Sequence, residues 1–138
     1  MMPHENIFID TSAWFALADK DDAYHKKAAS IYPSLLKSHT SLVTSNLIIA
    51  ESYILILKEL GHDAAINFLE GIKTSPRIFK IYSNEEIETD AEEILAKYDD
   101  HDFSYADAVS FAIMKELKIK KAFCFNKHFL TAGLEKIP

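Results

Sequence analysis

The chain has 138 residues, of which 49% are hydrophobic and 26% charged, and a formal net charge of −6. This length and composition predict a single domain over residues 1–138 with a substantial core, and they argue against a long disordered chain. The negative charge argues against a protein that binds nucleic acid by bulk charge alone, but it is compatible with a nucleic-acid enzyme.

In the first half of the chain we expect a strand at Asn6–Asp10 and a helix capped by Thr11 or Ser12 that extends through Leu17. A second helix should begin at Asp22 and extend through Ile31 or Tyr32, where Pro33 closes it and opens a short helix. A strand at Ser41–Thr44 and a helix capped by Ser45 or Asn46 that runs to about Leu60 should follow. In the second half we expect a helix at His62–Ile72, a strand at Ile78–Tyr82, a helix that begins with a Ser83–Glu86 capping box and ends near Lys97, a helix capped by Ser104 that runs to Leu117, a strand at Lys121–Phe125 and a short tail. Because helices alternate with continuously apolar strands, the pattern predicts an α/β fold with a parallel sheet covered by helices on both faces.

Several features bear on the location of the protein. The apolar stretch Leu47–Leu57 is interrupted by Glu51 and is too short to span a membrane. The N-terminal residues lack the basic segment and apolar core of a signal peptide. Cys124 has no cysteine partner in the chain, so an internal disulfide is excluded, and we expect it to be a buried packing residue. These features predict a cytoplasmic protein without a membrane segment.

Three acidic residues stand in apolar surroundings. Asp10 ends an apolar strand, Glu51 interrupts an apolar helix, and Asp107 lies in an apolar helical segment. An ionised carboxylate in such surroundings is costly unless it is paired or binds a metal. Because active crevices of parallel α/β sheets lie beyond the carboxyl ends of the strands, the three acids should project near one edge. Oxygen ligands suit Mg²⁺ or Mn²⁺, and such a site can activate water against a phosphodiester.

Each acid also has a purely structural interpretation. Asp10 could cap a helix or complement its dipole, and Asp107 could complete a capping box with Ser104. Glu51 could be the buried partner of a lysine or a hydroxyl. Spacing alone leaves these alternatives open.

Four segments together resemble the PIN domain, and more narrowly the VapC-type toxin ribonucleases of toxin–antitoxin pairs. They are Phe8-Ile9-Asp10-Thr11-Ser12, Ile49-Ala50-Glu51, Phe103–Ser110 and Ala122–Phe129, in an order and spacing typical of that family. The resemblance covers nearly the whole chain. It implies a Rossmann-like α/β/α sandwich, Mg²⁺- or Mn²⁺-dependent cleavage of RNA, a cognate antitoxin that blocks the site with a peptide segment, and a homodimer.

Carried over by position, the resemblance makes Asp10, Glu51 and Asp107 the catalytic and metal-binding acids. Ser12 would orient Asp10 or a water, and Ser110 would line the same edge. Asn126 stands where the family usually has a fourth acid, which puts a second metal in doubt. Asp102 is a candidate to compensate for the missing acid, with a solvated loop position as its alternative.

Further residues are candidates for contact with RNA. Lys127 and His128 follow Asn126 and could bind the phosphate backbone. Tyr24 and Tyr32 could stack on bases, but the sequence does not favour stacking over packing. For Lys118–Lys121 a solvated helix end is the better interpretation.

The sequence therefore predicts a metal-dependent endoribonuclease, a hydrolase that is the toxin of a toxin–antitoxin pair. The alternative is a non-catalytic PIN-like module that binds RNA or protein through a weakened metal site. A haloacid-dehalogenase-like phosphatase is a weaker third possibility, because that motif needs an aspartate where Ser12 stands.

Overall fold

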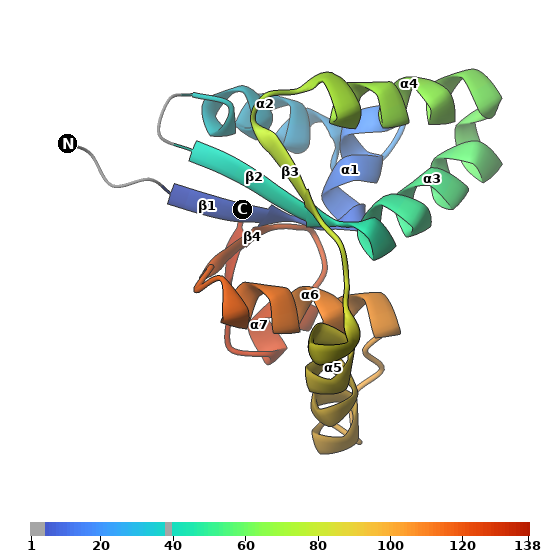
Figure 1. Ribbon diagram of the computed structural model, residues 1–138. Coiled ribbons are helices and arrows are strands. Elements are labelled where there is room, and N and C mark those ends of the chain that lie inside the picture. The colour runs from blue at the N-terminus through green and yellow to red at the C-terminus, as the bar shows by residue number, and fades with distance from the viewer. Residues whose placement is uncertain (1–4, 38–39) are drawn as a thin grey trace.

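Five parallel strands form one sheet with helices on both faces (Figure 1). The computed structural model describes residues 5–37 and 40–138. The strands are β1 (Glu5–Ile9), β2 (Thr40–Ser45), β3 (Ile78–Ile81), β4 (Lys121–Phe123) and β5 (Glu135–Ile137). The helices are α1 (Thr11–Ala18), α2 (His25–Leu35), α3 (Asn46–Leu60), α4 (His62–Thr74), α5 (Glu85–Lys97), α6 (Tyr105–Glu116) and α7 (His128–Thr131).

The strand order β3-β2-β1-β4-β5 places β1 at the centre of the sheet. From β1 the chain builds outward through β2 to β3, and it then returns to the other side of β1 to form β4 and β5. The direction of building therefore reverses between β1 and β4. In open parallel sheets this reversal opens a crevice at the carboxyl ends of the two strands.

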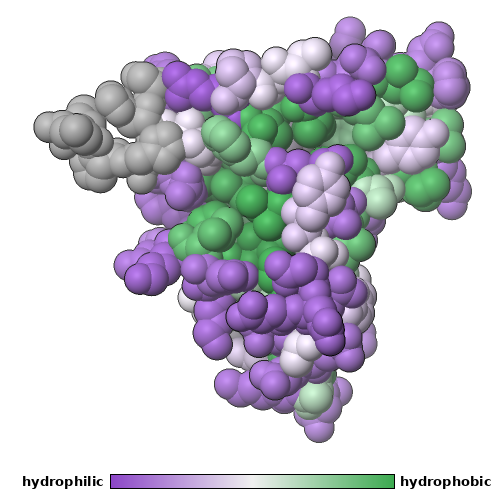
Figure 2. Space-filling model, viewed as in Figure 1, coloured by the Kyte–Doolittle hydropathy of each residue, from purple (hydrophilic) through white to green (hydrophobic). Residues whose placement is uncertain are grey.

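Helices α1 to α4 lie on one face of the sheet, and α5 to α7 lie on the other (Figure 1). The core between the layers is apolar and contains several fully buried aromatic rings. Phe129 of α7 packs against Phe8 of β1 and Phe111 of α6, with ring centroids 6.3 and 5.1 Å apart. The outer surface of α5 is strongly hydrophilic (Figure 2). The predicted sandwich around a parallel sheet is confirmed.

Three helix boundaries differ from the sequence-based prediction. Asp10, not Thr11 or Ser12, caps α1, because its side chain accepts the backbone N–H of Ser12. Asn84, not Ser83, caps α5 in the same way. Helix α2 begins at His25 instead of Asp22 and continues past Pro33 to Leu35. Pro33 has no backbone N–H to donate within the helix, and α2 ends two residues later, where the N–H of Leu36 donates to the carbonyl oxygen of Pro33.

The end of the chain is more ordered than the predicted short tail. The last predicted strand, Lys121–Phe125, ends at Phe123, and it is followed by the one-turn helix α7 and the edge strand β5. Each is only three or four residues long, and local propensity is weak over such lengths. Pairing with β4 and burial of Phe129 stabilise this segment. Across residues 5–37 and 40–138, no helix combines the length and apolarity needed to cross a membrane.

Candidate active site

A cleft of about 600 Å³ opens at the carboxyl ends of β1 and β4, where the order of the sheet reverses. All three predicted acids contribute to its wall. The lining residues are Asp10, Thr11, Ser12, Glu51, Ile54, Leu55, Lys58, Ser104, Asp107, Asn126 and His128. They come from the ends of two strands and from α1, α3, α6 and α7, so the fold gathers segments that are distant in sequence.

Asp10 is the acid at the end of β1, and it is 2% exposed. The Ser12 hydroxyl and the Asn126 amide both donate to its Oδ2, at 2.9 and 2.8 Å. Burial, together with the charge of Asp107, raises the pKa of Asp10 to about 6, and the hydrogen bonds from Ser12 oppose this rise. The ionised carboxylate is therefore under electrostatic strain that a cation in the cleft would relieve.

Asp107 is held at the start of α6 and is 7% exposed. It completes a capping box with Ser104, whose backbone N–H donates to Asp107 Oδ2 at 3.1 Å while its hydroxyl accepts the backbone N–H of Asp107. The same carboxylate oxygen lies 2.7 Å from Nδ1 of His128. The structural interpretation of Asp107 is thus correct, and the carboxylate nevertheless lines the cleft.

Glu51 differs from the other two acids, because its side chain is exposed in the cleft and not buried. Its apolar neighbours do not bury it. Helix α3 buries Ile48, Ile49 and Ile56, whereas Ile54 and Leu55 line the cleft beside Glu51. The Thr11 hydroxyl donates to Glu51 Oε1 at 2.6 Å and so links α3 to the start of α1.

The donor chemistry of the cleft fits a hard divalent cation. The side-chain hydrogen bonds described above reach Oδ2 of Asp10, Oδ2 of Asp107 and Oε1 of Glu51, and carboxylate oxygens are the ligands that such a cation prefers. The three acids line the same cleft, but their carboxylates do not already surround a common position. Within residues 5–37 and 40–138, no three Asp, Glu, His or Cys side chains already form a metal-binding group.

Asn126 follows β4 and takes the position predicted for it, beside Asp10. Its amide nitrogen donates to Asp10, and its Oδ1 accepts the backbone N–H of His128 at 3.0 Å. Ser12 lies at the same junction, because its hydroxyl also accepts the backbone N–H of Phe125 at 2.9 Å. Asp10 therefore receives hydrogen bonds from the neutral side chains of Ser12 and Asn126. A fourth acid at position 126 would repel Asp10 instead.

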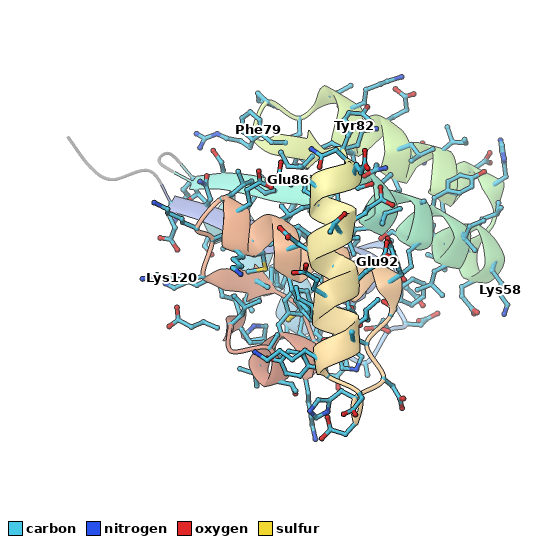
Figure 3. All side chains as sticks on the ribbon, turned by 60° about the horizontal axis from the view of Figure 1, so that its bottom comes forward. Lys58, Phe79, Tyr82, Glu86, Glu92 and Lys120 are labelled. Carbon is cyan, nitrogen blue, oxygen red and sulfur yellow. The ribbon has the colours of Figure 1, made fainter. Side chains whose placement is uncertain are left out.

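Other predicted residues lie outside the wall of the cleft. Ser110 is fully buried, and its hydroxyl donates to the carbonyl oxygen of Ala106 within α6, so it does not line the edge. Asp102 and Lys127 are exposed residues beside the site. The lysines before β4 lie elsewhere, because Lys120 and the cleft residue Lys58 are at opposite ends of the molecule (Figure 3).

The sequence-based prediction misses three polar contributors to the cleft. It gives Thr11 and Ser104 only as helix caps, and it omits Lys58. Lys58 was detectable in principle, because it lies seven residues after Glu51 and therefore on the same side of α3. The link from Thr11 to Glu51 joins residues 40 apart and has no local signal.

Comparison with known proteins agrees with this architecture. A PIN domain model matches residues 7–133. The 23S rRNA-specific endonuclease VapC20 of Mycobacterium tuberculosis is 32% identical over 131 residues, which cover 95% of this chain and 97% of VapC20. A VapC ribonuclease of Archaeoglobus fulgidus is 32% identical over 115 residues, 81% of this chain and 72% of that protein.

Two solved structures were also compared. The crystal structure of VapC20, described as a sarcin–ricin loop cleaving toxin, has a TM-score of 0.88, 32% identity, and coverage of 95% of this chain and 98% of the other. The structure of FitAcB from Neisseria gonorrhoeae, with a TM-score of 0.67, 17% identity and 96% coverage of both chains, supports the fold alone. The resemblance seen in the sequence is confirmed, and the chain belongs to the PIN domain family as a relative of the VapC ribonucleases.

Proposed function

We propose that the protein is a metal-dependent endoribonuclease that hydrolyses RNA phosphodiesters and is the toxin of a toxin–antitoxin pair. The observation that carries this proposal is the cleft that Asp10, Glu51 and Asp107 line together at the reversal point of the sheet. Relatives that match over most of this chain carry ribonuclease names, which supports RNA as the substrate.

In this proposal Asp10, Glu51 and Asp107 hold Mg²⁺ or Mn²⁺. The cation would supply Lewis-acid activation of water and neutralise charge that develops on the phosphodiester. The protein itself orients the acids: Ser12 and Asn126 fix Asp10, while His128 fixes Asp107. Glu51 comes from a separate helix and is exposed, so it completes the site from the opposite wall.

Lys58 and His128 are the basic residues of the cleft wall. We assign to them weak, sequence-independent contacts with RNA phosphates. These contacts would offset the electrostatic repulsion between RNA and a protein with three acids in its cleft and a net charge of −6. Lys127 is assigned the same role at the rim, because it is exposed between Asn126 and His128.

The test is cleavage of end-labelled RNA, both an unstructured oligonucleotide and a stem-loop with the sarcin–ricin sequence, in Mg²⁺, Mn²⁺ or EDTA. We expect cleavage only with a divalent ion, and a loss of at least about 100-fold for Asp10→Asn, Glu51→Gln and Asp107→Asn. The matched control is Glu92→Gln, an exposed acid on α5 (Figure 3) that does not line the cleft. Intact metal-dependent cleavage by Glu51→Gln would show that the assignment is wrong.

A non-catalytic module that binds RNA or protein is the second candidate, and Asn126 is the observation that favours it. Asn126 donates to Asp10 where the family usually has another acid, so the site offers one charge fewer to a metal. Under this alternative, wild-type protein binds RNA without cleaving it, and Asn126→Asp creates or greatly increases cleavage. Under the leading proposal, the wild type already cleaves.

We also propose that two copies associate as a homodimer through the β3 edge. This strand has no partner on its outer side in the described sheet, and its Phe79 is 49% exposed. Figure 2 shows apolar surface beside β3, with polar side chains next to it. Two such edges can meet in a self-complementary way about a two-fold axis. Light scattering should show a dimer that Phe79→Lys dissociates; a monomeric wild type would contradict the proposal.

The cognate antitoxin and the cytoplasmic location complete the proposal. Co-expression with the product of an adjacent reading frame that encodes a small DNA-binding protein should suppress the cleavage described above. Purified antitoxin that leaves cleavage unchanged would remove the toxin–antitoxin part of the proposal while leaving the nuclease part intact.

A further inference from the structure

An aromatic stack stands beside the cleft and has no role in the site described so far. The rings of Tyr24 and Phe125 are nearly parallel, with centroids 4.6 Å apart and planes 14° from each other. Tyr24 is nevertheless 50% exposed. Among the described residues, Phe125 is the one ring in contact with Tyr24, and the Tyr24 hydroxyl has no hydrogen-bond partner.

The stack is connected directly to the acids. The backbone N–H of Phe125 donates to the Ser12 hydroxyl, which in turn donates to Asp10. The next residue, Asn126, lines the cleft and donates to Asp10 as well. The ring of Phe125 is therefore positioned by the same hydrogen bonds that orient Asp10, and Tyr24 extends this aromatic surface outward from the cleft.

The loop that carries Tyr24 is held in place by its own hydrogen bonds. Asp19 accepts the backbone N–H of Asp21 at 2.9 Å, and Asp22 accepts that of Tyr24 at 3.0 Å. Nδ1 of His25 lies 2.7 Å from the carbonyl oxygen of Ala16. Because the chain is already fixed on both sides of Tyr24, little conformational entropy would be lost when a flat ligand stacks on the ring.

We propose that Tyr24 is a stacking platform for an unpaired nucleobase of the RNA substrate, close to the cleaved phosphodiester. This inference rests on the proposed ribonuclease function and adds a base-binding position to it. Stacking on an aromatic ring binds bases without positive charge, which suits a chain with a net charge of −6. Tyr32, the other tyrosine considered from the sequence, is unsuited because it is partly buried against Trp14.

The test compares Tyr24→Ala and Tyr24→Trp with the control Tyr82→Ala. Tyr82 is a 64% exposed tyrosine that does not line the cleft and contacts Lys80. With an RNA whose cleavage site has been mapped, we expect Tyr24→Ala to raise KM and lower kcat/KM at least about fivefold, the lower limit for one base on an aromatic ring. Tyr24→Trp and Tyr82→Ala should stay within about twofold of the wild type.

RNAs with one abasic nucleotide near the cleavage site separate stacking from a structural role. When the missing base is the one that stacks on Tyr24, kcat/KM of the wild type should fall. Tyr24→Ala should then cause no further fall in kcat/KM on that RNA. An effect of Tyr24→Ala that persists with every abasic RNA, or no effect with intact RNA, would overturn the inference.

If the wild type does not cleave RNA, the proposed ribonuclease function is wrong, but the stacking role of Tyr24 can still be tested. The same variants are then compared by fluorescence anisotropy of RNA binding. Loss of binding in Tyr24→Ala alone would still support the platform. Equal binding by all variants, or no binding by any, would overturn it.

Discussion

Replacing Asp10 by asparagine should stabilise the protein while destroying the proposed activity. The carboxylate is 2% exposed, and its pKa is raised from 3.8 to about 6 by burial and by Asp107. A shift of this size means that the ionised form costs roughly 3 kcal/mol above pH 6, at about 1.4 kcal/mol per pKa unit. Asparagine carries no charge, remains a good helix cap and can still accept from Ser12.

The sign of the pH dependence follows from proton binding. Between about pH 4 and pH 6 the folded protein holds a proton on Asp10 that the unfolded chain has lost, so wild-type stability falls as the pH rises through this window. The advantage of Asp10→Asn should therefore be near zero at pH 4, grow up to pH 6 and then level off. We expect a plateau of about 1 to 3 kcal/mol, because an amide only approximates a protonated acid.

Urea unfolding in EDTA at several pH values between 4 and 8 measures this difference. The matched control is Glu51→Gln, which removes an acid from the same cleft but from an exposed position, so no comparable gain is expected. Added Mn²⁺ should stabilise the wild type and have less effect on Asp10→Asn. A variant that is no more stable at pH 8, or whose advantage is the same at pH 4 and pH 8, would refute the argument that burial strains Asp10.

Two further substitutions and one labelling experiment test other parts of the structure. Asn126→Asp should lower stability in EDTA, because it replaces the donor 2.8 Å from Asp10 with a second carboxylate, and isothermal titration should show tighter Mn²⁺ binding; unchanged binding would mean that residue 126 does not face the metal. Cys124 is fully buried and burial raises its pKa to about 12, so a thiol reagent should label it only at the rate of unfolding; rapid labelling of folded protein would contradict this burial. Phe129→Ala should cost about 3 to 5 kcal/mol in urea unfolding, because it empties a fully buried ring site; a loss below about 1 kcal/mol would mean that α7 is not part of the core.

The sequence predicted the sheet well because its strands are dense in apolar residues. Ile7, Phe8 and Ile9 are all buried in β1, and their run ends at the residue that begins the site. The last part of the chain could not be predicted in the same way. Strand β5 has three residues, two of them charged, and it forms because β4 offers a partner and not because of its own pattern.

The two interpretations of Asp10 and Asp107 turned out not to be alternatives. Asp10 caps α1, and Asp107 belongs to the capping box of α6. In a parallel α/β fold, helices begin where strands end, so an acid that caps a helix also stands at the edge where the crevice opens. Capping chemistry and a cation site therefore call for the same residue type at the same place, and a sequence pattern alone cannot separate them.

Glu51 is free of this ambiguity, and it is therefore the most informative acid. It lies in the second turn of α3, caps nothing, and is exposed, so neither burial nor a helix terminus requires a carboxylate there. Its described hydrogen bond comes from Thr11, which a glutamine oxygen could accept equally well. Because the fold does not need the charge of Glu51, a loss of cleavage in Glu51→Gln with unchanged stability would assign that charge to function. The corresponding changes at Asp10 and Asp107 replace buried carboxylates at helix starts, so they change stability as well and cannot make that distinction on their own.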